Sequence, residues 1–273
     1  MQQPAFLYKG EEAQDPKNNF LSILHPQEQK QITPVKVLFF SGGKDSFLAI
    51  RALARQYQDS LKHDDPENPP FALILLTTFD STSRIIAHQE VPISDVVQQA
   101  EHLKIPLIGV PMQRGSTEKY HERIRRALNI IEHPTKKQNN INFLKIVSLA
   151  FGDLHLEHIR GWRETAFGAN GFEKYRREYP LWKIPYSSLM EDLELSKVPI
   201  KIAACTVGEK ADEKKEAKDK ICTTVATVGT MFNREIYEQV VKEGFDGFGE
   251  NGEFHSIAQV WEVTREVALG FPH

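Results

Sequence analysis

Cysteine is scarce in this chain of 273 residues, which has only Cys205 and Cys222. The two do not form a CxxC pair, and no Cys/His pattern has the spacing of a structural zinc site. The sequence therefore indicates neither a disulfide framework nor a zinc-stabilised fold. This cysteine usage fits a reducing compartment, and we expect a cytoplasmic protein.

Long apolar runs and a basic excess are missing as well. No stretch approaches the roughly 18 apolar residues of a membrane span, and the first residues do not have the pattern of a signal peptide. Lys and Arg total 34 against 37 Asp and Glu, a formal net charge of -3. A membrane partner is not expected, and a dedicated nucleic-acid binder is disfavoured.

The chain does contain enough apolar residues, 40%, to bury a sizeable core in one large or two modest domains. Residues 1–33 are polar and weakly periodic, and we expect a flexible extension outside that core. Residues 34–167 alternate short apolar runs with helical periodicity. The runs expected to be strands are 35–40, 71–78, 105–112 and 143–153, and the expected helices are 47–57, 92–104 and 116–131, the last capped by Ser116.

Alternating strands and helices predict an α/β fold with a doubly wound, Rossmann-like parallel sheet and helices on both faces. The rhythm weakens in residues 168–273, where we expect a smaller C-terminal α/β domain. Its expected elements are strands at 198–207 and 254–263 and a helix at 233–243. The mixed-charge run at 209–220 is interpreted as a solvated helix or loop.

The most informative motif is Ser41-Gly42-Gly43-Lys44-Asp45-Ser46, which stands between the first expected strand and its helix. Two glycines let backbone N–H groups face a pyrophosphate, and the helix N-terminus adds a positive dipole end. The lysine adds charge and the serines add donors. The motif is not a Walker A loop, because Asp45 follows the lysine. A carboxylate beside a triphosphate implies Mg²⁺, unless Asp45 only caps the helix.

This motif resembles the SGGxDS loop of the N-type ATP pyrophosphatases, which include GMP synthetase, NAD synthetase and tRNA-modifying sulfurtransferases. The resemblance narrows to the diphthine–ammonia ligase family and its bacterial relatives through an ordered set of further motifs. These are HQEVPISDVVQQAEHLKIPLIGVPM, FGDLHLEHIR, YPLW and GENGEFH.

The resemblance implies a HUP-type ATP-binding domain over residues 34–167 and an acceptor-substrate domain over residues 168–273. It also implies ATP and Mg²⁺ as cofactors and an AMP-forming amide ligase. In that reaction a carboxylate attacks the α-phosphorus, pyrophosphate leaves and ammonia displaces AMP. Diphthine on translation elongation factor 2 would be the acceptor, with ammonium as the second substrate. Homodimer formation is left open.

Further candidate residues follow other strands. Thr77 and Thr78 end the second strand, where the resemblance implies nucleotide contacts, although β-branched residues are also ordinary in strands. Gly152 permits close approach to an adenosine, and Asp153 could bind a ribose hydroxyl or a metal. The alternative for Asp153 is a helix cap.

The stretch from His155 to Arg160 also contains candidates. His155 and His158 lie three residues apart, but a zinc site needs a third ligand that the sequence does not offer. The resemblance instead implies Glu157 and Arg160 as acceptor-pocket residues and strengthens Trp182 as a wall of the substrate cleft.

The last candidate is the segment Glu250-Asn251-Gly252-Glu253-Phe254-His255. Its carboxylates could hold ammonium, deprotonate it or share Mg²⁺, and its histidine could act as a base. The family resemblance favours an acceptor-side site formed by Glu250, Asn251, Gly252, Glu253 and His255 over a solvated hairpin turn.

Three other readings stay open beside the amide ligase. The chain could be a tRNA sulfurtransferase, an enzyme that amidates a small molecule, or a non-catalytic nucleotide sensor. The sulfurtransferase needs a cysteine pair and a basic surface, and the sequence offers neither clearly. The sensor needs no acceptor site, so the acidic segment near Glu250 argues against it.

Overall fold

The computed structural model describes residues 3–9, 33–62, 69–86, 89–113, 120–133, 144–205 and 223–271. Ser116, Cys222 and the charged run at 209–220, which the sequence analysis singled out, lie outside these ranges.

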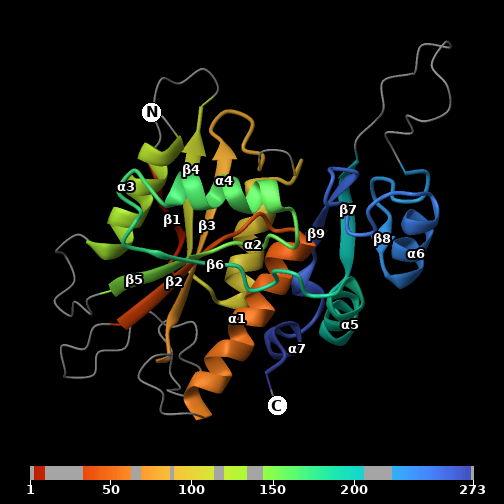
Figure 1. Cartoon of the computed structure of the whole chain (residues 1–273), viewed down its shortest axis with the longest axis horizontal. Helices are drawn as coiled ribbons and strands as arrows, with labels where there is room; N and C mark the ends of the chain where they lie inside the picture. Colours follow the sequence, from red (N-terminus) through yellow and green to blue (C-terminus); the bar gives the residue numbers. More distant parts are fainter. Residues whose placement is uncertain are drawn as a thin grey trace.

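A six-stranded sheet forms the centre of the molecule, in the order β1-β4-β3-β2-β5-β6 (Figure 1). Every neighbouring pair is parallel except β1 with β4. The strands are β1 Ala5–Tyr8, β2 Thr33–Phe39, β3 Ala72–Asp80, β4 Leu107–Met112, β5 Leu144–Ala150 and β6 Arg176–Glu178. The predicted α/β fold with a mostly parallel, Rossmann-like sheet is confirmed.

The strand order reverses next to β2. From β2 the chain adds β3 and β4 on one side, and it then returns to add β5 and β6 on the other. The ends of β2 and β5 therefore border a topological switch point, the place where open α/β sheets bind ligands. The segment after β2 is residues 41–46, and the segment after β5 contains Gly152 and Asp153.

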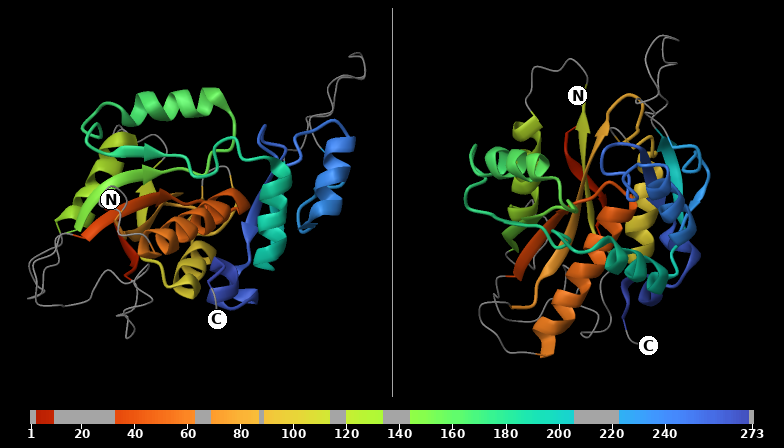
Figure 2. Two further views of the ribbon diagram at one scale, coloured as in Figure 1. Left: turned by 60° about the horizontal axis from the view of Figure 1, so that its bottom comes forward. Right: turned by 45° about the vertical axis from the view of Figure 1, so that its right-hand side comes forward.

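Helices cover both faces of the sheet, as expected (Figure 2). Helices α1 (Lys44–Lys62) and α2 (Ile93–Leu103) pack on one face, and α3 (Tyr120–Glu132) and α4 (Glu157–Phe167) pack on the other. The strands supply both cores because their side chains alternate: Val37 joins the α3 and α4 side and Leu38 the α1 and α2 side. In the described part of the chain, no helix has the length and apolarity to cross a membrane.

A second, antiparallel sheet lies beside α1 and α2, in the order β8-β7-β9 (Figure 1). Its strands are β7 Ile200–Cys205, β8 Met231–Phe232 and β9 Phe254–Ala258, and helices α5 (Tyr186–Ser196), α6 (Arg234–Lys242) and α7 (Arg265–Leu269) accompany them. Apolar residues of β7 and β9 belong to the same buried cluster as those of α1 and α2. The two sheets therefore share one continuous core, and β6 joins the large sheet beyond the expected boundary at residue 167.

Two expectations about the chain ends are wrong. Residues 1–33 were expected to lie outside the core, but Ala5–Tyr8 forms an antiparallel edge strand on β4. Four residues are too few to show an alternating pattern against polar neighbours. The strand expected at 254–263 stops at Ala258, and a 3₁₀ turn follows at Val260–Glu262.

The packing of β1 on β4 requires Gly109. A Cβ atom there would lie 2.5 Å from Leu7 Cδ1 and 3.1 Å from Phe79 Cε1. We expect Gly109→Val to lower the free energy of unfolding by about 1–3 kcal/mol through overpacking, measured by urea denaturation. Gly161→Ala is the matched control, because nothing lies within 4 Å of a Cβ at that helical position. The control should gain about 0.5–1 kcal/mol. Equal effects of the two substitutions would contradict this account of β1.

Candidate functional site

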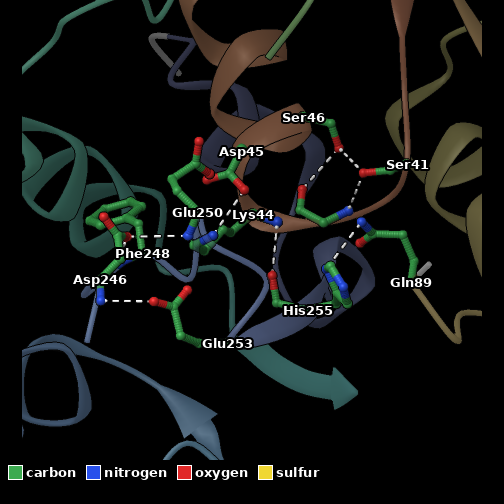
Figure 3. Close-up of polar contacts among 12 residues, drawn as sticks. Ser41, Lys44, Asp45, Ser46, Gln89, Asp246, Phe248, Glu250, Glu253 and His255 are labelled. Atoms are coloured by element: carbon green, nitrogen blue, oxygen red, sulfur yellow. Dashed lines mark hydrogen bonds and ion pairs between the residues drawn. The ribbon is translucent and has the colours of Figure 1, made fainter. Parts of the chain in front are cut away.

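The glycine loop, residues 41–46, joins β2 to the first turn of α1, which begins at Lys44. Gly42 has φ +83°, a conformation that glycine adopts without strain. Ser46 Oγ donates to the Gly43 carbonyl at 3.0 Å, and Gly43 N donates to Ser41 Oγ at 3.4 Å (Figure 3). Both serines predicted as ligand donors therefore shape the loop in this structure.

Glycines suit these positions because other chain segments pass very close, and a Cβ atom would force the neighbouring backbone to shift. A Cβ atom on Gly43 would lie 3.1 Å from the Ser256 carbonyl oxygen of β9. A Cβ atom on Gly152 would lie 3.2 Å from the carbonyl carbon and oxygen of Asp45. Gly152 was expected to make room for an adenosine; in the structure it makes room for the first turn of α1.

The acidic loop, residues 244–253, is organised by two of its own carboxylates. Asp246 Oδ1 accepts hydrogen bonds from Phe248 N at 2.8 Å and Glu250 N at 3.2 Å. The buried Glu253 accepts from Asp246 N and from Asn251 N, both at 3.0 Å. Glu253 therefore holds the loop together, and Glu250 is left as the carboxylate that faces the glycine loop (Figure 3).

Lys44 joins the two loops. Its ammonium group lies 2.9 Å from Asp45 Oδ2 and sits over the rings of Phe248 and Phe254, at 5.3 and 5.5 Å from their centroids. Its backbone N–H donates to Ser256 Oγ at 3.2 Å. The loops predicted separately from the sequence thus meet at one place, although 212 residues separate Lys44 from Ser256.

Glu250 stands in an unfavourable electrostatic environment. Burial, together with the negative charges of Asp45, Asp246 and Asp153, raises its pKa from 4.5 to about 8, and Lys44 opposes this shift. The local excess of negative charge suits a cationic ligand.

The Mg²⁺ expected from the sequence fits part of this arrangement. Asp45 Oδ1 is buried and accepts no hydrogen bond from any residue that the structure describes. The described ranges contain no group of three or more His, Cys, Asp or Glu that could hold a metal alone. Protein Mg²⁺ sites often use one or two carboxylates completed by substrate phosphates, so Asp45 could hold the ion beside a nucleotide.

Asp153, the second predicted metal ligand, is held by α4. Its two carboxylate oxygens accept from Arg163 Nε at 2.6 Å and Arg163 Nη2 at 3.1 Å. Arg163 also stacks over Phe151 at 4.5 Å. Both oxygens of Asp153 are therefore bonded to Arg163 and are not free to bind a metal in this structure, although the Asp153 charge still raises the pKa of Glu250.

The remaining predicted nucleotide contacts lie at the end of β3. Thr77 is buried, and its hydroxyl has no hydrogen-bond partner among the described residues. Thr78 is half-buried. Their contact with a nucleotide stays a prediction.

The predicted acceptor residues fall into two groups. Arg160 and Trp182 come together, since the guanidinium lies 4.7 Å from the Trp182 ring centroid and 4.8 Å from that of Tyr179. Glu157 is exposed and pairs with Lys183 at 2.7 Å. Arg160 and Trp182 thus form a stacked surface, while Glu157 makes a solvent-exposed ion pair.

Tyr186 was missed by the sequence analysis. Its hydroxyl donates to Asp246 Oδ2 at 2.8 Å and lies 3.2 Å from His155 Nδ1, and its ring stacks on Phe248 at 4.4 Å. Burial and the Asp246 carboxylate raise its pKa, so the phenol stays protonated near neutral pH.

Asp246 was missed as well. Its only signal in the sequence is the Asp-Gly pair that it begins, which is typical of a turn.

His255, at the start of β9, lies beside the glycine loop (Figure 3). Its Nδ1 is 3.4 Å from Gln89 Nε2. The Gln89 side chain also approaches the loop, since its Oε1 is 3.4 Å from the position of a Cβ on Gly43.

Comparison with protein-family models gives no match, and comparison with curated proteins gives no significant match.

The raised pKa of Glu250 predicts a pH dependence of stability. Between pH 4.5 and about 8 the folded chain keeps a proton that the unfolded chain releases, so this group lowers the free energy of unfolding as pH rises. Glutamine does not titrate, so Glu250→Gln removes this decrease in the free energy of unfolding. We expect the stability of the variant relative to wild type to increase from pH 5 to pH 8.5, measured by urea denaturation. Glu191→Gln, which changes an exposed carboxylate on α5, is the control; a Glu250→Gln difference that stays constant with pH would contradict the assignment.

Proposed function

We propose that this chain is an ATP-dependent, AMP-forming amide ligase that adenylates a carboxylate and transfers ammonia to it. One observation supports this most strongly: Glu250 of the acidic loop stands against the glycine loop at the switch point of the sheet. A nucleotide-binding sensor needs only the first loop. A ligase needs an acceptor-side group close to the phosphates.

The nucleotide side of the proposal draws on the glycine loop. The N-terminal end of the 19-residue helix α1, with its positive dipole end, favours a phosphate. Ser41, Ser46 and Ser256 already bond to loop atoms, so a phosphate would join or replace these contacts. Lys44 would stabilise charge that develops when pyrophosphate leaves the α-phosphorus. Bound Mg²⁺ would neutralise phosphate charge.

The acceptor side needs a group that removes protons from ammonium. In the second step the nitrogen lone pair attacks the acyl carbon, the acyl–phosphate bond breaks, AMP leaves with its electron pair and the new amide sheds a proton. Glu250, with a pKa of about 8, would be basic enough to take a proton from ammonium once it is ionised, and the ionised share grows as the pH approaches 8. Asp246 and Glu253 would hold this carboxylate in place through the loop backbone.

Diphthine on translation elongation factor 2 is the acceptor that the motif resemblance favours, and the cytoplasm would be the compartment. Arg160, which lies over the rings of Tyr179 and Trp182, follows β5 near the same end of the sheet and would contact the acceptor. This assignment extends the resemblance of the FGDLHLEHIR and YPLW motifs.

The test uses α-labelled ATP with Mg²⁺ and ammonium, with and without elongation factor 2 that carries diphthine, followed by separation of AMP from ADP. We expect AMP only when the acceptor is present. ATP binding without AMP for any carboxylate acceptor would refute the ligase and favour a sensor. Sulfur incorporation into tRNA would refute it in favour of a sulfurtransferase.

Variants separate the two halves of the site. Glu250→Gln should keep ATP affinity within about threefold and lower kcat by about 10²-fold or more, the range for loss of a general base. Lys44→Ala should weaken ATP use itself. Titration calorimetry and AMP formation measure the two effects, with Glu191→Gln as control. Full turnover in Glu250→Gln would rule out its role as the proton acceptor.

A further inference from the structure

Gln99 of α2 is a fully buried polar side chain that lies outside the catalytic assignments above. Its Nε2 donates to the Gly42 carbonyl at 2.8 Å and to the Ala258 carbonyl at 2.7 Å. Gly42 belongs to the glycine loop, and Ala258 is the last residue of β9, the strand that leaves the acidic loop. One side-chain amide therefore joins the two halves of the proposed site.

The same junction contains a direct backbone bond. Ala258 N donates to the Gly42 carbonyl at 3.0 Å, so that oxygen accepts two hydrogen bonds and the Ala258 carbonyl accepts one from Gln99. The junction is tightly packed, since a Cβ atom on Gly42 would lie 2.7 Å from Gln99 Oε1 and would force that side chain to shift. Gln99 and the Ala258 amide therefore both bridge the glycine loop and the end of β9.

Helix α2 holds the chain beyond β9 as well. His102 Nε2 lies 2.8 Å from the Val263 carbonyl, and Arg265 Nε donates to the Leu103 carbonyl at 3.0 Å. These contacts fasten the segment after β9 to α2, while Gln99 fastens the end of the strand to the glycine loop.

We propose that Gln99 is a positioning residue that keeps the glycine loop and β9 in register, and so sets where Glu250 stands relative to a bound nucleotide. The proposal rests on the proposed function for its kinetic consequence only. Its structural consequence concerns the junction and is measurable without any substrate. A buried amide is needed because removing its N–H groups would leave the Ala258 carbonyl without this donor at a buried position.

The test compares Gln99→Met with Gln98→Met, an exposed position on the same helix. In hydrogen–deuterium exchange, Gln99→Met should speed exchange of the Ala258 amide by about tenfold or more, because local opening becomes easier. The Leu75 amide, which donates to Pro106 within the large sheet, should exchange as in wild type. Gln98→Met should change neither. Unchanged exchange at Ala258, or an equal increase at both amides, would overturn the proposal.

Kinetics provide the second readout. If the wild type forms AMP, Gln99→Met should lower kcat by about 10-fold to 100-fold, because small misplacements at a reacting centre are costly, with KM for ATP changed by less than about threefold. A loss confined to KM, or unchanged kcat, would overturn the positioning role. If the wild type forms no AMP, the ligase proposal fails while the exchange result still decides the role of Gln99. Should Gln99→Met not fold, Gln99→Asn withdraws the amide by one methylene and takes its place.

Discussion

Close approach of backbone to backbone around the first turn of α1 is the constraint on which the site depends. The turn lies against the segment after β5 at Gly152 and against β9 at Gly43, with no room for a Cβ at either contact without adjustment of the neighbouring backbone. Two segments that the sheets bring in from different parts of the chain are thus fixed to the same helix end. The positions of Lys44 and Glu250 follow from this packing and from the bonds within the acidic loop.

The site concentrates charge that the fold does not neutralise. The Lys44 ammonium pairs with Asp45 and also lowers the pKa of Glu250. Burial and the charges of three carboxylates raise that pKa by more than Lys44 lowers it. Tyr186 and Asp246 are, by contrast, well bonded and hold the loop that carries Glu250. Two hydrogen-bonded side chains therefore hold in place a carboxylate, Glu250, whose charge the protein does not balance. This is the pattern expected where a bound ligand supplies the missing charge.

The sequence predicts the large sheet well because its buried strands are continuous apolar runs and its helices are strongly periodic. It predicts residues 41–46 as a turn at a helix start because two adjacent glycines have few other uses there. It misses β1 and β6 of that sheet, which are short, and it cannot rank the carboxylates of the acidic loop. Glu250 and Glu253 look alike in sequence; only the hydrogen bonds to Asp246 N and Asn251 N distinguish them. Helical spacing from Val96 places Gln99 on the buried face of α2. Its partner, the Ala258 carbonyl of β9, lies far along the chain, so no local pattern reveals that contact.

The separation between Lys44 and Ser256, 212 residues, has a consequence for how the protein is made. A ribosome releases β2 to β6 well before β9, so the large sheet can pair while the partner of the glycine loop is still unsynthesised. Until then the Gly42 carbonyl lacks the hydrogen bond from Ala258 N. Because apolar residues of β7 and β9 belong to the same core as those of α1 and α2, the packing on that face of the sheet is completed, together with the site, only after β9 has been made.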